Sequence, residues 1–402
     1  MTPFIKRVAL SATYASFLFA SAAQAADIKL GALYPFSGGL ALLGDESFRG
    51  VELAVDERNA AGGINGQKIV LVKGDAVDAN QAVGEARRLT SVENVTAIFG
   101  SYASGVALAA TQVTELAGVP YFELGAVADS VTDRGFKYVF RSNATAKAFA
   151  QGTIDAIENV IAPALGVPAK SLRVAIIYED GPYGTMLSGF QKTSAKKLGL
   201  NVVEELAYPA KSVDLSALVL RLKGAKADVI LQTSYQNDTI LFLRKAQQSG
   251  FKPKAIVGAG GGYSMADTEK VLGATIDGVL DVDFPQASMK ESGAPGLGVF
   301  VKAYEARYKS APRSGHSLVN YTGAKEFLDV LAAAKSTDKD KIRASVMAVN
   351  KPVGSNASGG GTKFGENGQN TLALTNLMQW QKGKLMTVYP PAVANAAPAF
   401  TK

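Results

Sequence analysis

The chain has no cysteine and a single histidine, His316, among its 402 residues. The lack of cysteine excludes disulfides, thiol catalysis, a lipid-modified cysteine anchor and zinc sites with cysteine ligands. One histidine leaves almost no material for multi-histidine metal sites or for a serine–histidine–aspartate relay. We therefore expect neither a metal nor another cofactor. The core alone must stabilise the fold, and a chain of this length can bury a large one.

Long cationic runs and long apolar runs are also missing. The formal net charge is +7, but Lys and Arg are scattered, in no run longer than a pair such as Lys196-Lys197. This pattern argues against nucleic-acid binding. Beyond residue 25 no segment has the roughly 20 consecutive apolar residues that a membrane-spanning helix needs.

The N-terminus has the features of an export signal. Lys6 and Arg7 precede a mostly apolar stretch over 8–22, and Ala23-Gln24-Ala25 has the small-x-small pattern of a cleavage site. An uncleaved anchor is the weaker alternative, because the stretch is short and rich in Ser and Ala. We predict a signal peptide over 1–25 and a periplasmic mature protein that is not lipid-anchored.

Strand patterns and helix patterns alternate along most of the chain. Strands are predicted at 28–33, 68–73 and 95–100, with amphipathic helices such as 45–59 between them. The alternation of strand and helix patterns begins again after Arg141. Further strands are predicted at 172–178, 201–207, 227–233, 255–258 and 279–284. This alternation predicts an α/β fold with two mostly parallel sheets covered by helices.

The C-terminal part has a different pattern. Residues 372–380 and 385–389 flank Gly383 and predict a β-hairpin. Residues 390–402 are rich in Ala and Pro and predict a disordered tail.

Several small, polar loops follow predicted strands, where open parallel sheets bind their ligands. Residues 100–105 open a helix and offer hydroxyl and N–H groups to an anion, although an ordinary strand–helix turn explains the same residues. Residues 125–127 occupy a similar place. Residues 258–262 are glycine-rich, but Tyr263 stands where a dinucleotide loop needs its third glycine. The acidic pair Glu179-Asp180 also follows a strand, and a solvated loop accounts for it.

Catalytic patterns are weak by comparison. The chain has no G-x-S-x-G motif, and its one histidine is not in a triad pattern. These residues favour binding over catalysis.

The order and spacing of many short motifs carry a resemblance to a known family. The mature chain resembles, over nearly its whole length, the periplasmic branched-chain amino-acid (leucine/isoleucine/valine) binding proteins of ABC transporters, which are type I periplasmic binding proteins. The motifs lie at 28–33, 37–38, 44–45, 62–66, 75–78, 118–121, 134–135, 183–184, 214–222, 243–250 and 363–368.

The resemblance implies two Rossmann-like lobes joined by three hinge crossovers, near Ser142, Phe284 and Ser355. The N-lobe would combine 26–142 with 285–355, and the C-lobe 143–284 with 356–389. A monomer of this kind traps a small molecule between its lobes. Its further partners would be the membrane permease subunits of an ABC transporter.

The family also implies ligand contacts at particular positions. Ser104 and the backbone at Gly125 match the group that holds the ligand carboxylate, whereas Val127 has lost a hydroxyl. Tyr235 matches an aromatic residue on the C-lobe side. We expect Tyr34 and Tyr102, together with Phe36, to add aromatic surface.

The largest departure from the family pattern is at Gly260. The family places there the carboxylate that pairs with the ligand ammonium, and a buried ammonium without a counter-charge is costly. Either Glu123 or Glu179 would have to substitute for it. His316 falls where the family often has an aromatic pocket wall.

Four hypotheses follow for the function. The first is a binding protein for a small carboxylate without an essential amine, such as an aromatic or keto acid. The second is a binding protein for an amino acid or amide, with Glu123 or Glu179 as the replacement anion. The third, a secreted α/β enzyme, lacks a dinucleotide motif and a histidine base. The fourth, a sensor domain that presents its ligand to a receptor, uses the same fold.

Overall fold

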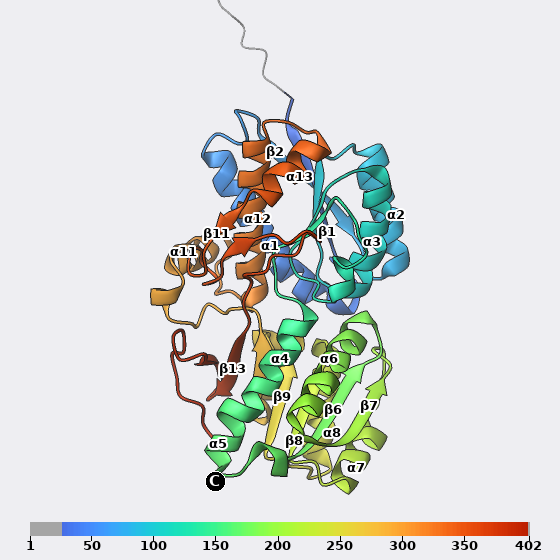
Figure 1. Cartoon of the computed structure of the whole chain (residues 1–402), viewed down its shortest axis with the longest axis vertical. Coiled ribbons are helices and arrows are strands. Elements are labelled where there is room, and N and C mark those ends of the chain that lie inside the picture. Colours follow the sequence, from blue (N-terminus) through green and yellow to red (C-terminus); the bar gives the residue numbers. More distant parts are fainter. Residues whose placement is uncertain (1–25, 401–402) are drawn as a thin grey trace, which may run out of the picture.

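The computed structural model describes residues 26–400, which form two α/β lobes (Figure 1). The predicted signal peptide, residues 1–25, lies outside the described residues. A five-stranded sheet forms the centre of the first lobe and a seven-stranded sheet the centre of the second. The predicted fold class, two parallel-rich sheets of a type I periplasmic binding protein, is confirmed. Within residues 26–400, no helix has the length and apolar character to cross a bilayer.

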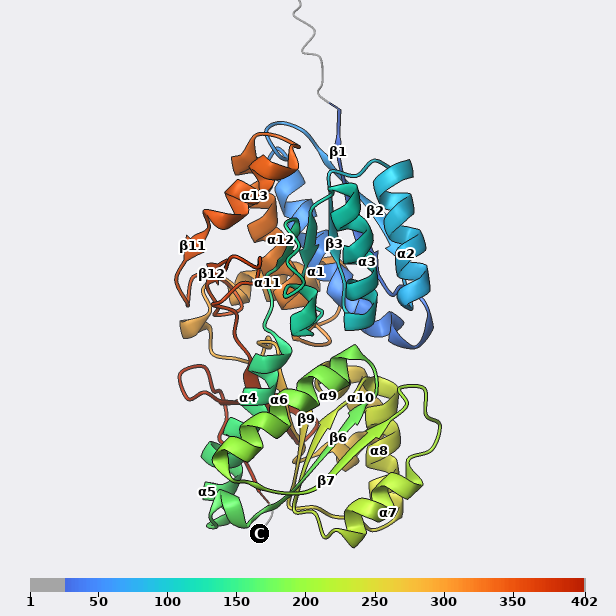
Figure 2. The ribbon, with the colours of Figure 1, turned by 45° about the vertical axis from the view of Figure 1, so that its right-hand side comes forward.

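The first-lobe sheet has the strand order β2-β1-β3-β4-β5, with every pairing parallel. Its strands are β1 (Ile28–Tyr34), β2 (Ile69–Asp75), β3 (Ala97–Gly100), β4 (Tyr121–Glu123) and β5 (Val139–Arg141). Its helices are α1 (Ala41–Ala60), α2 (Ala79–Arg87), α3 (Ser104–Ala117), α11 (Leu297–Tyr308), α12 (Gly315–Ala334) and α13 (Lys339–Met347). Helices α1 and α12 cover one face of the sheet, and α2 and α3 cover the other (Figure 2).

The second-lobe sheet has the strand order β14-β13-β10-β9-β8-β6-β7. Its parallel strands are β6 (Arg173–Glu179), β7 (Asn201–Tyr208), β8 (Val229–Thr233), β9 (Ala255–Ala259) and β10 (Leu280–Asp283). The predicted hairpin is present as the antiparallel strands β13 (Asn376–Gln381) and β14 (Lys384–Tyr389). Its helices are α4 (Ala146–Ala156), α5 (Ala162–Leu165), α6 (Pro182–Leu198), α7 (Ser216–Gly224), α8 (Gln236–Gln248), α9 (Gly261–Ser264) and α10 (Ala266–Leu272).

Helix α12 returns from the second lobe to complete the first. It packs against α1 at Gly50, where a Cβ atom would stand 2.1 Å from the carbonyl oxygen of Ser317, so only glycine permits this approach. The rings of Phe122 on β4 and Phe327 on α12 stack with their centroids 4.1 Å apart. The first-lobe core is thus built from two segments far apart in the sequence.

The third passage between the lobes lies later in the chain than the predicted position near Ser355. Phe364 packs against the rings of Phe140 and Phe327 in the first-lobe core. A small antiparallel sheet of β11 (Asn350–Lys351) and β12 (Thr362–Lys363) holds the same segment. The chain therefore enters the second lobe only between Asn370 and β13. The apolar anchor Phe364 is the physical reason for the shift.

The prediction of a disordered tail is wrong for the described part of it. The Gln379 side chain on β13 donates to the carbonyl of Ala399 at 2.7 Å and accepts from its N–H at 2.7 Å. The backbone N–H of Asn395 donates to the carbonyl of Thr387 at 3.0 Å. These polar contacts hold a segment whose composition alone indicates disorder.

Replacing Phe364 by Ala tests whether this segment belongs to the first-lobe core. We expect the F364A change to lower the free energy of unfolding, measured in urea, by about 3 kcal/mol, because it empties a buried aromatic site. Val213 is 90% exposed, and V213A, the control, should stay within about 0.5 kcal/mol of the wild type. Equal values for the two variants would show that residues 356–370 form a linker without a share in the core.

Candidate ligand-binding site

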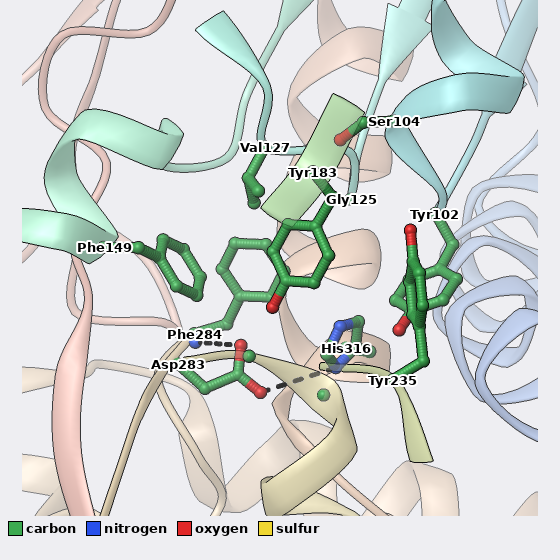
Figure 3. Close-up of a pocket in the computed structure, with 12 residues that line it drawn as sticks. Tyr102, Ser104, Gly125, Val127, Phe149, Tyr183, Tyr235, Asp283, Phe284 and His316 are labelled. Atoms are coloured by element: carbon green, nitrogen blue, oxygen red, sulfur yellow. Dashed lines mark hydrogen bonds and ion pairs between the residues drawn. The ribbon is translucent and has the colours of Figure 1, made fainter. Parts of the chain in front are cut away.

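A cavity of about 280 Å³ lies where the two lobes meet (Figure 3). The first lobe contributes Tyr102, Ser104, Gly125, Val127 and His316, and the second lobe contributes Phe149, Tyr183, Tyr235, Gly260, Gly261, Asp283 and Phe284. The rings of Tyr102 and Tyr235 touch across it, with their centroids 5.9 Å apart, so the lobes are closed over the cavity.

The first-lobe wall ends in the N-terminus of α3. Ala103 precedes this helix and offers no side-chain cap, so the N–H groups of the first turn are open to a ligand. The positive end of the helix dipole points the same way. Ser104, the first helical residue, accepts a hydrogen bond from the N–H of Ala128 at 3.2 Å, which leaves its own hydroxyl proton available. This corner of the cavity is suited to a carboxylate.

Glu123 holds the loop that follows β4. Its Oε1 accepts from the backbone N–H groups of Ser101, Gly125 and Ala126 at 2.7, 2.8 and 2.7 Å. Burial raises the pKa of Glu123, and these N–H groups oppose the rise. Glu123 is therefore a structural carboxylate outside the cavity lining, and its predicted role as a replacement anion is wrong. Because the N–H of Gly125 is occupied, only the carbonyl of that residue is left for a ligand.

Arg141 holds the same loop from the other side. Its buried guanidinium donates to the carbonyls of Ala126 at 3.2 Å and Ala128 at 2.7 Å, and to the side chain of Gln369. Burial lowers the pKa of Arg141 to about 10, so it keeps its charge at neutral pH. The loop that carries Gly125 and Val127 is fixed by opposite charges.

The second predicted anion, Glu179, also has a structural role. It accepts from the N–H groups of Gly181 and Gly184 at 2.7 and 2.6 Å, at the start of α6. It does not line the cavity. The prediction that Glu179 pairs with a ligand amine is therefore wrong as well.

Tyr34 is the predicted site residue that lies elsewhere. Its ring is fully buried in the first-lobe core against Phe36 and Phe48, and its hydroxyl donates to Oδ1 of Asn320 at 2.7 Å. The alternation of side chains along β1 points it toward α1 and α12 and away from the second lobe. The other predicted residues, Tyr102, Ser104, Gly125, Val127, Tyr235, Gly260 and His316, all surround the cavity.

Tyr183 explains why position 260 carries no side chain. Gly260 has φ +96°, and a Cβ atom there would lie 2.3 Å from the Tyr183 hydroxyl oxygen. That hydroxyl donates to the carbonyl of Ala259. The ring of Tyr183 thus fills the space into which a carboxylate at position 260 would project.

Asp283 is the acidic residue that the cavity does contain. It ends β10, and its oxygens accept from the N–H of Phe284 at 2.7 Å and the hydroxyl of Ser264 at 2.5 Å. His316 Nδ1 lies 3.9 Å from Oδ2. Burial raises the pKa of Asp283 and lowers that of His316, so the imidazole is neutral at pH 7.

Sequence reasoning missed five lining residues, which are Phe149, Tyr183, Gly261, Asp283 and Phe284. The acidic residue had a detectable signal. In β10, Asp281 and Asp283 alternate with Leu280 and Val282, so both acids share one face of a strand in the middle of the sheet. Among residues 26–400, no group of three or more acidic or histidine side chains could hold a metal ion.

Two parallel-sheet lobes closed over one small cavity define the class of bilobal solute-binding proteins. The family model for periplasmic binding proteins matches residues 27–384. The Leu/Ile/Val-binding protein homolog 7 of Brucella melitensis is 55% identical over 96% of this chain and 97% of its own length. Homolog 8 of Brucella suis is 54% identical over 98% and 97%.

The chain therefore belongs to the periplasmic binding protein family. It is a substrate-binding protein of the ABC-transporter type and not an enzyme.

Solved structures with lower identity support the fold alone. The branched-chain amino acid binding protein LivJ of Streptococcus pneumoniae, in complex with isoleucine, is 23% identical with a TM-score of 0.77 and covers 89% of this chain and 97% of its own. A solute-binding protein of R. palustris, in complex with 4-hydroxybenzoate, is 23% identical with a TM-score of 0.78 and covers 90% and 95%. One fold thus binds both an amino acid and an aromatic acid in these two proteins.

Replacing Gly260 by Ala tests the dependence of the cavity on Tyr183. We expect G260A to lower the free energy of unfolding by about 1–3 kcal/mol more than G278A does, because its methyl group displaces the Tyr183 ring. Gly278 is the matched control, since it has φ +85° and no atom lies within 4 Å of the place that a Cβ would take there. Adding Tyr183→Phe to G260A should recover part of the loss in urea unfolding. Equal losses in the two glycine variants would contradict this account.

Proposed function

We propose that this protein is the solute-binding component of an ABC importer and traps a small carboxylate-bearing solute between its lobes in the periplasm. The observation that carries the proposal is the Ser104 corner of the cavity. There the hydroxyl proton of Ser104 and the uncapped first turn of α3 face the space between the lobes. Membrane permease subunits would then receive the solute from the closed protein.

The cavity lining adds a second requirement for the solute. Five aromatic side chains surround the space, those of Tyr102, Phe149, Tyr183, Tyr235 and Phe284. An apolar body of the size of a branched or aromatic side chain would be desolvated by these rings. The names of the Brucella relatives support branched-chain amino acids as candidates.

An aromatic or keto acid without an amine is the second candidate. The absence of a carboxylate at Gly260 and of a hydroxyl at Val127 favours it, because these positions hold the ligand amine and carboxylate in the resembling family. The 4-hydroxybenzoate complex of the R. palustris protein shows that this fold accommodates such an acid.

A thermal-shift screen of the purified mature protein separates these classes. The panel contains amino acids, amides, aromatic acids and keto acids, and a specific ligand raises the melting temperature by mass action. We expect stabilisation only by compounds that carry a carboxylate. Stabilisation by amides alone, or turnover of a bound compound, would contradict the proposal.

Replacing Ser104 by Ala tests the carboxylate corner. We expect affinity for any carboxylate found in the screen to fall roughly 10- to 100-fold by calorimetry, because a hydrogen bond to a charged group contributes about 1.5–3 kcal/mol. The control is Ser188→Ala, since the Ser188 hydroxyl donates to the carbonyl of Thr185 inside α6, outside the cavity lining. Unchanged affinity in S104A with a wild-type melting temperature would place the carboxylate elsewhere.

A sensor role with the same fold makes a different prediction. A strain lacking this protein should lose uptake of the radiolabelled solute if the protein feeds an importer. Normal uptake together with a lost transcriptional or chemotactic response would favour the sensor.

A further inference from the structure

The second lobe contributes one side chain to a hydrophobic cluster of the first lobe. Met265 joins α9 to α10 of the second lobe and is fully buried. All other buried residues of its cluster belong to the first lobe, among them Leu33 on β1 and Leu43 on α1. Met265 does not line the cavity between the lobes. This apolar contact therefore connects the two lobes outside the site proposed for the solute.

The backbone shortly before Met265 also lies directly against the first lobe. A Cβ atom at Gly261, the first residue of α9, would stand 3.0 Å from Cδ2 of Leu43 and 2.8 Å from Cε1 of His316. A larger residue would hold the lobes apart here, so glycine permits the close approach. Figure 2 shows α9 and α10 at the edge of the second lobe that faces the first. This packing brings Met265 within reach of the first-lobe cluster.

Two polar contacts with the first lobe follow along the same segment. The N–H of Ala266 donates to the carbonyl of Arg313 at 2.9 Å, and Oδ2 of Asp267 lies 3.8 Å from Nε of Arg313. Helix α1 of the first lobe holds Arg313 in turn. The backbone N–H of Arg313 donates to Oε1 of Glu46 at 3.0 Å, and its guanidinium donates to Oδ2 of Asp45 at 3.1 Å. The second-lobe segment thus contacts a residue that is fixed to the first lobe.

Three consecutive residues, Met265, Ala266 and Asp267, connect the lobes in this way, and we call them the latch segment. The latch segment and Arg313 lie outside the three crossovers, so their contacts belong to the closed arrangement of the lobes. A contact made only in the closed form shifts the equilibrium between separated and closed lobes. The apparent affinity for a solute scales with the fraction of protein in the form that binds it, whatever the chemistry of the solute.

We propose that the latch segment holds part of the solute-free protein closed and thereby sets the affinity for every solute by one common factor. This inference goes beyond the proposed function, because it needs no particular group on the solute. The cavity lining at Ser104 would decide which solute binds, and the latch segment would decide how tightly it is held.

The absence of cysteine allows each lobe to be labelled at one chosen site. Leu116 on α3 and Leu220 on α7 are 81% and 63% exposed, one on each lobe. Spin labels on the Leu116→Cys, Leu220→Cys protein, refolded from urea without solute, report the distance between the lobes by double electron–electron resonance. We expect a component at the distance of the closed structure, and Met265→Ala should lower the ratio of closed to separated lobes roughly 10-fold or more, because it removes a buried apolar contact. Absence of the closed component from the otherwise wild-type protein would overturn the proposal.

Met378→Ala is the matched control for Met265→Ala. Met378 is a fully buried methionine of the same lobe, on β13 within the second-lobe sheet, and it is not part of the first-lobe cluster. Its truncation should lower the stability in urea but leave the ratio of closed to separated lobes unchanged. An equal loss of the closed component in both variants would reveal general destabilisation and contradict a latch at Met265.

Asp267→Asn is a second variant that leaves the core filled. It removes the charge that faces Arg313, and we expect it to lower the ratio of closed to separated lobes roughly 2- to 5-fold, since partly exposed ion pairs contribute little. The control is Lys270→Ala, which removes only the partner of Asp267 within α10, at 3.1 Å. If neither Met265→Ala nor Asp267→Asn changes the ratio, the proposal is wrong.

Calorimetry distinguishes an effect on the lobe equilibrium from an effect on the cavity. The wild type and Met265→Ala would be titrated with leucine, isoleucine, valine and 4-hydroxybenzoate. We expect the variant to weaken every solute that binds by the same factor, so the ratios of affinity between solutes keep their wild-type values. Weakening of one solute alone would place the effect of Met265 in the cavity and overturn the proposal. Binding of none of the four would count against the proposed solutes, whereas the distance measurement, made without solute, still decides whether the latch segment acts.

Discussion

The geometry of the cavity depends on two buried side chains of opposite charge, Glu123 and Arg141, which hold the same loop through separate hydrogen bonds. Glu123 accepts hydrogen bonds from backbone N–H groups at the ends of β3 and β4. Arg141 donates hydrogen bonds to carbonyl groups of the same loop and to the side chain of Gln369. Truncating either side chain would leave buried backbone groups without their hydrogen-bond partners, at a cost of about 1–3 kcal/mol for each such group. Two adjacent strand ends and the segment before the last crossover are thereby fixed by the hydrogen bonds of these two side chains.

This constraint also explains which residues can be found from the sequence and which cannot. The alternation of strands and helices, the terminal hairpin and the Ser104 corner follow from local periodicity and from glycine-rich turns, which the sequence displays directly. The alternation of Asp281 and Asp283 with Leu280 and Val282 marks two acids on one face of a buried strand, but it does not show that Asp283 lines the cavity. The direction in which a buried acid points depends on the neighbouring strands, and periodicity alone does not specify it.

Three residues that the sequence predicts for the site have structural roles instead, for the same reason. Glu123 and Glu179 have the right chemistry for an amine site, yet both are used to satisfy backbone N–H groups at turns. Tyr34 is aromatic and close to the cleft in sequence, but the pleat of β1 directs it into the core. The tail after Tyr389 is ordered by side-chain contacts from Gln379, which composition does not reveal. In each case the groups that the side chain contacts in the folded protein determine what it does, and the residue type alone does not.

The division of the cavity between lobes has a kinetic consequence. The first lobe alone supplies the Ser104 corner, whereas the second lobe supplies Asp283, Tyr183 and Tyr235. A solute that meets the protein with its lobes apart can engage one wall before the other arrives, so encounter and residence time depend on different sets of side chains. Natural variation on the second lobe would then alter how long a solute is retained, while its rate of capture stays the same.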